Sequence, residues 1–306
     1  MLQKLIEICV SSGRPIYVWL DGPKNENDRG AFECAQWLRE RVSDFPNNFK
    51  IKVNAENLGV RRSVFLAISW ALSSTDRLIV LEDDVVPGEY FFNFMDMALA
   101  TFEDWEDIQH VNGWIPDVVY SRISHPSIFL SRNTFGWGWA TWKNRWSEFT
   151  TTQLDLLDFE PNLRIRRFPG LKNFRLNSIF EIYWKNALKR CKDGLDTWDY
   201  QWNLNMWKLG RFAITPLSRF TTNIGVDSEA THTTLSHLKN TQSLDISNFQ
   251  QRRILEDLRV PDLQLSTNEV LDASIDLSLR GFNPLWSKRR VLSFRITSFL
   301  KRKNLL

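Results

Sequence analysis

The stretch Leu78-Ile79-Val80-Leu81-Glu82-Asp83-Asp84 decides the fold that we expect of this chain. Four consecutive apolar residues predict a buried strand, and three acids follow directly at its carboxyl end. Carboxylates so close together repel one another and raise each other's pKa. A hard divalent cation such as Mg²⁺ or Mn²⁺ would offset the repulsion, because it binds carboxylate and phosphate oxygens together.

The alternative reading of this stretch is a solvated acidic turn in which Asp84 caps the following helix. The apolar run before the acids and the Pro87-Gly88 turn after them favour the cation site. A cation held there would neutralise a leaving diphosphate and orient it.

Strand and helix patterns alternate through the first half of the chain, most regularly up to residue 112. Apolar runs predict strands at 15–20, 49–53, 77–81 and 108–112. Helical periodicity predicts helices at 1–10, 28–41, 60–72 and 88–102, and later at 174–190 and 199–209, the last closed by Gly210. We expect residues 113–175 to be irregular and aromatic, and residues from 211 to 280 to form loops and short helices. The alternation predicts an α/β fold, a mainly parallel sheet with helices on both faces.

Polar residues follow three of the predicted strands. Asp21, Asn57 and the acids Glu82–Asp84 each stand at or just after a strand end. Ligands of parallel α/β sheets bind at the carboxyl ends of the strands, so we expect these groups to converge. Gly136 and Gly138, set between aromatic residues, would allow close approach of the backbone to a ligand or a strand.

Composition narrows the class of protein. The chain has 306 residues, 43% of them hydrophobic and 25% charged, which is typical of a folded protein with a sizeable core. A net charge of +3 gives no indication of a nucleic-acid partner. The cysteines, Cys9, Cys34 and Cys191, form no pair with metal-ligand spacing, which favours a reducing compartment. With no apolar run long enough to span a membrane and no signal-peptide pattern at the start, we expect a cytoplasmic location.

The 14 tryptophans are the outlier of the composition, and ten of them fall between residues 105 and 207. Indole rings stack well on sugars, but they also fill hydrophobic cores. For most of them we predict core packing.

The acids and a series of short motifs resemble the GT-A glycosyltransferases, and more narrowly bacterial family-2-like enzymes related to N-acetylglucosaminyltransferase I. The motifs occur in this order: Asp21-Gly22-Pro23-Lys24, Glu56-Asn57-Leu58-Gly59, Glu82-Asp83-Asp84, Val111-Asn112-Gly113-Trp114, Phe135-Gly136-Trp137-Gly138-Trp139, Thr197-Trp198-Asp199-Tyr200-Gln201-Trp202 and Asn223-Ile224-Gly225. They cover residues 1 to 235. Together they are specific for fold and donor class, but not for the sugar.

The resemblance implies roles for individual residues. Asp21 would contact the uracil or ribose, and Glu82 and Asp83 would face the ribose and the sugar. Asp84 would hold Mn²⁺ or Mg²⁺, and Asp199 would be the catalytic base of an inverting transfer. A carboxylate is suited to that task, because an acceptor hydroxyl must lose its proton in the transition state. From the sequence alone Asp199 reads equally as a helix N-cap.

Further candidates are weaker. Asn57 stands at a strand end, and Arg61 and Arg62 follow it at a helix start, where they would pair with a diphosphate or simply be solvated. His232 is either a ligand near the phosphates or a loop residue without a role. The resemblance also implies a strand ahead of the first helix. This chain begins inside that helix, so we expect no strand before residue 10.

We therefore predict a GT-A domain at 1–235 and a C-terminal extension at 236–306. Basic and apolar residues interleave at 286–303, which suggests either peripheral contact with an anionic membrane, at its inner face, or a solvated helix.

The predicted activity is metal-dependent transfer of a hexose or N-acetylhexosamine from a nucleotide sugar, a UDP-sugar, to a glycan or lipid-linked glycan in polysaccharide biosynthesis. The alternatives are a truncated non-catalytic relative, a sugar nucleotidyltransferase and a carbohydrate-binding module.

Overall fold

A computed structural model describes residues 2–41, 44–45, 49–116, 127–155, 174–225 and 248–259, with Leu265, Asp272 and Ile275. Its helices are α1 (Leu2–Ser11), α2 (Arg29–Arg41), α3 (Gly59–Leu72), α4 (Phe91–Thr101), α5 (Lys143–Trp146), α6 (Thr151–Leu154), α7 (Phe174–Lys192), α8 (Asp199–Lys208) and α10 (Asn248–Asp257). Its strands are β1 (Ile16–Leu20), β2 (Phe49–Val53), β3 (Arg77–Val80), β4 (Val85–Pro87), β5 (Ile108–Asn112), β6 (Ile128–Ser131), β7 (Trp139–Trp142), β8 (Phe212–Pro216) and β9 (Thr221–Asn223).

The predicted α/β class is confirmed, and the elements expected up to residue 112 are present. The expectation that no strand precedes residue 10 is also confirmed, since Leu2–Ser11 is helical. Gly210 ends α8 as predicted, with φ of 75° and the Arg211 N–H donated to the Met206 carbonyl at 2.9 Å.

Two stretches expected to lack strands contain them, and these predictions were wrong. The stretch 113–175 includes β6 and β7, and the stretch after Gly210 includes β8 and β9. All four residues of β7, Trp-Ala-Thr-Trp, are buried, so this strand has no alternation of apolar and polar residues. Short strands buried on both faces leave little periodic signal in a sequence.

The strands of the described residues form three sheets. β1 and β2 pair in parallel, and β4 pairs antiparallel with β9. The largest sheet has the order β3-β7-β5-β8-β6 and is mixed, because only β5 and β8 run parallel within it. The parallel arrangement predicted from the first half of the chain therefore holds for β1 and β2, while the later strands insert antiparallel neighbours.

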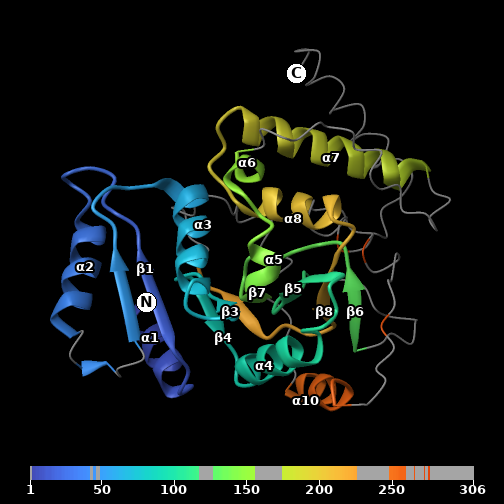
Figure 1. The fold of residues 1–306 in the computed structure, drawn as a ribbon, viewed down its shortest axis with the longest axis horizontal. Helices are drawn as coiled ribbons and strands as arrows, with labels where there is room; N and C mark the ends of the chain where they lie inside the picture. The colour runs from blue at the N-terminus through green and yellow to red at the C-terminus, as the bar shows by residue number, and fades with distance from the viewer. Residues whose placement is uncertain are drawn as a thin grey trace.

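Helices cover both faces of the five-stranded sheet (Figure 1). Helix α8 lies on one face beneath α7, and α4 and α10 lie on the other. Helix α3 stands between this sheet and the β1–β2 pair: its Ser63 accepts a hydrogen bond from the Trp19 indole at 2.9 Å, and its Ile68 packs near Val80.

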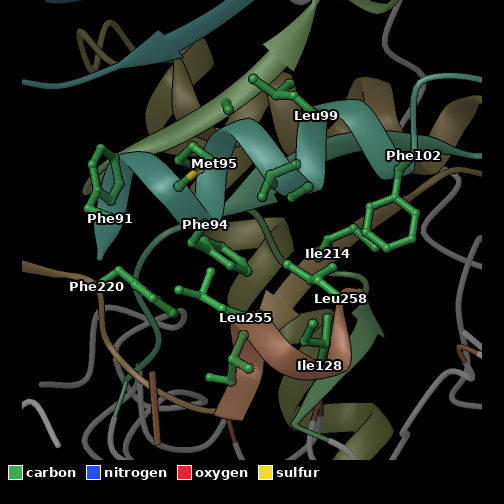
Figure 2. Packing of buried hydrophobic residues seen from close by; sticks show 14 of the residues in the cluster. Phe91, Phe94, Met95, Leu99, Phe102, Ile128, Ile214, Phe220, Leu255 and Leu258 are labelled. Carbon is green, nitrogen blue, oxygen red and sulfur yellow. The ribbon is translucent and has the colours of Figure 1, made fainter. Parts of the chain in front are cut away.

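The core on the α4 face joins segments that are far apart in the sequence (Figure 2). The Phe94 and Phe220 rings stack with centroids 4.4 Å apart, and Leu255 and Leu258 from the α10 segment complete the layer. A helix beyond residue 235 thus builds the same core as α4.

Core packing is confirmed as the place of most tryptophans. Eight of the ten between residues 105 and 207 are buried, whereas Trp105 is 43% exposed. The buried tryptophans are Trp114, Trp139, Trp142, Trp146, Trp184, Trp198, Trp202 and Trp207.

The position of α10 predicts that Leu255→Ala destabilises the whole domain by about 2–5 kcal/mol, because it leaves a cavity against α4. Arg253→Ala, on the exposed side of the same helix, should change stability by less than about 0.5 kcal/mol. Urea unfolding followed by tryptophan fluorescence measures both. Equal effects of the two substitutions would mean that α10 is not docked in this core.

Candidate functional site

The acids after β3 form a tight turn. The Val85 N–H donates to the Glu82 carbonyl at 3.1 Å, and the chain then enters β4. The three acids differ in burial: Asp83 is exposed, while Glu82 and Asp84 are partly buried. The alternative of a fully solvated acidic turn therefore fits Asp83 only.

Asp84 is held by the segment after β9. One carboxylate oxygen, Oδ2, accepts the Asn223 amide at 3.1 Å, and the Asp84 carbonyl accepts the Ile224 N–H at 2.8 Å. A Cβ on Gly225 would lie 2.3 Å from Oδ2, so a glycine is required at this close approach. The other oxygen, Oδ1, is buried and has no hydrogen-bond partner. Burial raises the pKa of Asp84, although the Asn223 hydrogen bond opposes the rise.

Glu82 has the most unfavourable surroundings of the three acids. Burial, and then the nearby charges of Asp84, Asp199 and Asp83, raise its pKa to about 8, against an ordinary value of 4.5. The ion pairs within the described part of the chain include none of these four carboxylates. Within the described residues, no protein cation forms an ion pair with this group of acids.

Asp199 reaches the same place from the start of α8. Its carboxylate accepts a hydrogen bond from the Thr197 hydroxyl. The negative charge of Asp199 contributes to the raised pKa of Glu82. The N-cap of α8 is Trp198, without a side-chain cap, so Asp199 does not serve as the N-cap that the sequence also allowed.

Trp198 connects the acids to the hydrophobic core. A Cβ on Gly136 would lie 3.3 Å from Cζ2 of Trp198 and 3.7 Å from Oε1 of Glu82, so both side chains lie against this glycine. The Trp198 ring stacks on Trp139 with centroids 5.2 Å apart. Trp139 in turn stacks on His110 at 4.8 Å. No pattern in the sequence assigns a role to Trp198 or His110; the one signal is the Thr-Trp-Asp segment itself.

His110 is a neutral core histidine. Burial lowers its pKa to about 3. Its Nδ1 accepts the Trp202 indole N–H at 3.1 Å, so the proton of the neutral ring is on Nε2. Its ring packs against Trp139 as part of the aromatic stack.

Asp21 and Asn57 lie together at the ends of β1 and β2. The Asp21 carboxylate accepts the Leu58 N–H at 3.1 Å, and the Asn57 amide donates to the Gly22 carbonyl at 3.0 Å. A Cβ on Gly22 would lie 2.3 Å from the Glu56 backbone, so the two turns are in direct contact. The predicted convergence is present for this pair, whose hydrogen bonds run between their own turns and not to the β3 acids.

Arg61 is engaged elsewhere. Its guanidinium donates to the Cys191 carbonyl at 3.4 Å and, in a shorter bond, to the Leu195 carbonyl. The nearby Asp196 accepts the Val60 and Arg61 N–H groups at 2.6 and 2.9 Å, and so caps α3 from a distant segment. Because these bonds fasten α3 to the end of α7, we leave Arg61 out of the proposed site.

The residues present fit a metal site in which the protein supplies one ligand and a bound diphosphate and water supply the others. Among the described residues, no three or more His, Cys, Asp and Glu side chains are arranged to hold a metal ion. The buried, unpartnered Oδ1 of Asp84 does fit a divalent cation that takes its other ligands from a diphosphate and water.

No protein-family model and no curated protein matches this chain. His232 and the segment 286–303 lie outside the described residues. In the portion that is described, none of the helices combines the length and the apolar character needed to cross a membrane.

The raised pKa of Glu82 predicts a specific pH dependence of stability in metal-free buffer. A folded-state pKa near 8 and an ordinary value of 4.5 mean that stability falls as pH rises from 4.5 to 8, by at most about 1.4 kcal/mol per pH unit. Glu82→Gln should flatten this fall, so that the variant becomes more stable than the unaltered protein at pH 8.

Urea unfolding at pH 5, 6.5 and 8 with a chelator present measures the effect. Glu33→Gln, at an exposed position of α2, is the matched control and should leave the pH profile unchanged. A Glu82→Gln profile parallel to that of the unaltered protein would show that Glu82 ionises normally.

Proposed function

We propose that this chain is a metal-dependent glycosyltransferase of the GT-A type, which transfers a sugar from a UDP-sugar to a hydroxyl of a glycan acceptor. The proposal rests on one observation above all: the carboxylates of Glu82, Asp84 and Asp199 come together from two distant segments, and no ion pair of the described residues includes them. Such a group is costly in a folded protein unless a cationic ligand binds there.

The buried acids suit two different tasks. Asp84, with a free Oδ1, would hold Mn²⁺ or Mg²⁺, and the bound cation would supply charge neutralisation to the leaving diphosphate. Glu82, with Asp83 beside it, would face the ribose and sugar of the donor. Asp21 and Asn57 are assigned to the nucleoside, since they lie at neighbouring strand ends.

Asp199 would act as the base. Its carboxylate takes the proton of the acceptor hydroxyl while the hydroxyl oxygen bonds to the anomeric carbon. The bond from that carbon to the diphosphate oxygen breaks, and its electron pair leaves on the diphosphate. The hydrogen bond from Thr197 holds Asp199 for this task, and attack from the side opposite the diphosphate gives inversion.

Calorimetric titration of UDP, with and without Mn²⁺, tests the proposal. We expect binding that requires Mn²⁺ and that Asp84→Asn weakens by more than about 100-fold, since loss of even an outer partner of a metal costs about 10–100-fold. Asp76→Asn, an exposed acid at the opposite end of β3, is the matched control and should bind UDP normally.

Failure of the unaltered protein to bind UDP with either Mn²⁺ or Mg²⁺ would contradict the proposed donor site. Binding that Asp84→Asn and Asp76→Asn reduce equally would contradict the assignment of the metal to Asp84.

A further inference from the structure

We propose that Asp196 and Arg61 are positioning residues for Asp199, and that together they hold the segment that carries this carboxylate against the first turn of α3. The inference rests on the proposed function, in which Asp199 is the base. Neither Asp196 nor Arg61 contacts donor, metal or acceptor in that proposal.

The first observation is the place of the Asp196 side chain at the start of α3. Its Oδ2 accepts the Val60 N–H at 2.6 Å, and its Oδ1 accepts the Arg61 N–H at 2.9 Å. The first amides of a helix have no partner within the helix, and the N-cap of α3, Leu58, makes no side-chain cap bond. A carboxylate 135 positions along the chain from Arg61 supplies the missing acceptors instead.

The second observation is a further attachment of the same segment to α3. The Arg61 guanidinium donates to the Leu195 carbonyl and, at 3.4 Å, to the Cys191 carbonyl. The backbone at Leu195 and the side chain of Asp196 are thus both held by the first turn of one helix. The segment cannot shift along α3 without breaking several hydrogen bonds, and those to the ionised Asp196 are of the stronger, charge-assisted kind.

The third observation is the close approach of Gly59 to this contact. Gly59 has a φ of 75°, and a Cβ there would lie 2.5 Å from Oδ2 of Asp196. Both the conformation and the contact therefore require glycine. Gly59 also belongs to the turn that Asn57 begins, since the Asn57 side chain accepts the Gly59 N–H at 3.2 Å. The turn assigned to the nucleoside and the segment that carries the base meet at this glycine.

The path from Asp196 to Asp199 is short and is held again at its other end. The Thr197 hydroxyl donates to Asp199. The Trp198 ring stacks on Trp139 of β7 with centroids 5.2 Å apart. Loss of the attachment to α3 would leave this stack in place but let Asp199 shift. Misplacement of a reacting group by about 1 Å can cost about 100-fold in rate.

The experiment separates binding from reaction. Calorimetry measures UDP binding with Mn²⁺ present, and UDP release measures cleavage of UDP-glucose and UDP-N-acetylglucosamine with water as acceptor. The attacking water gives its proton to Asp199, as an acceptor hydroxyl would. Asp196→Asn should lower kcat about 10–100-fold. It should change the Kd for UDP by less than about twofold, because Asp84, Asp21 and Asn57 keep their own contacts.

Arg61→Met is the second variant. It removes the guanidinium but keeps an unbranched side chain, and it should lower kcat without weakening UDP binding. The matched control is Asp28→Asn, at a half-buried carboxylate that accepts the N–H groups of Lys24 and Ala31 at the start of α2, at 2.9 and 3.4 Å. It should leave both kcat and the Kd for UDP unchanged.

Cleavage that Asp196→Asn leaves unaltered would overturn the inference. An equal loss of UDP binding and cleavage would overturn it too, since it would show a merely structural role. So would weakened UDP binding in Arg61→Met, which would place the guanidinium on the diphosphate. Absence of UDP binding by the unaltered protein would instead overturn the proposed donor site. Binding without cleavage of either sugar nucleotide would overturn the role of Asp199 as base, and the inference with it.

Discussion

The antiparallel pairing of β3 with β7 is the contact on which the site depends. Val80 faces Trp139 in this pair, so the residues after Val80 run alongside the residues before Trp139. Just before Trp139 the chain passes Glu82, since a Cβ on Gly136 would lie 3.7 Å from Oε1 of that residue. It also fixes Trp139, on which Trp198 stacks, and so brings the start of α8 and Asp199 to the end of β3. One register thus determines which distant residues surround the acids.

A second pairing holds the other side of the acidic turn. β4 and β9 run antiparallel with Val85 opposite Asn223, which places the Asn223 amide beside Asp84. Gly225 follows at a distance that no side chain would allow. The chain therefore passes Asp84 closely and occupies one oxygen while it leaves the other without a partner.

The part of this arrangement that could be predicted from the sequence is the part that is local. The run Leu78–Leu81 followed by acids gave the strand, its end and the possibility of a cation site. Gly136 and Gly138 indicated close approach, which is confirmed by the backbone bond of Gly113 to the Gly138 carbonyl at 2.8 Å.

The nonlocal part could not be predicted from the residues alone. β7 is short and wholly buried, so neither its existence nor its register leaves a periodic trace. Without that register, Trp198 is one tryptophan among fourteen, and the proximity of Asp199 to Glu82 rests on resemblance only. His110 is similar: a histidine within an apolar strand gives no sign that its ring will support a stack of tryptophans.

The acids discussed above fall into two groups, those that accept hydrogen bonds from backbone N–H groups of other segments and those that do not. Asp21 and Asp196 accept N–H groups at or near the start of α3, where unpaired amides and the helix dipole favour negative charge. Backbone N–H groups therefore offset the charges of Asp21 and Asp196. Among the bonds of the described residues, Asp84 accepts one from the Asn223 side chain, and burial raises the pKa of both Glu82 and Asp84.

A fold that needed these two carboxylates only for stability would satisfy them as it satisfies Asp21. An unfavourable group that is nonetheless held firmly by two strand pairs and an aromatic stack is the expected form of a binding site, where the ligand supplies the missing charge.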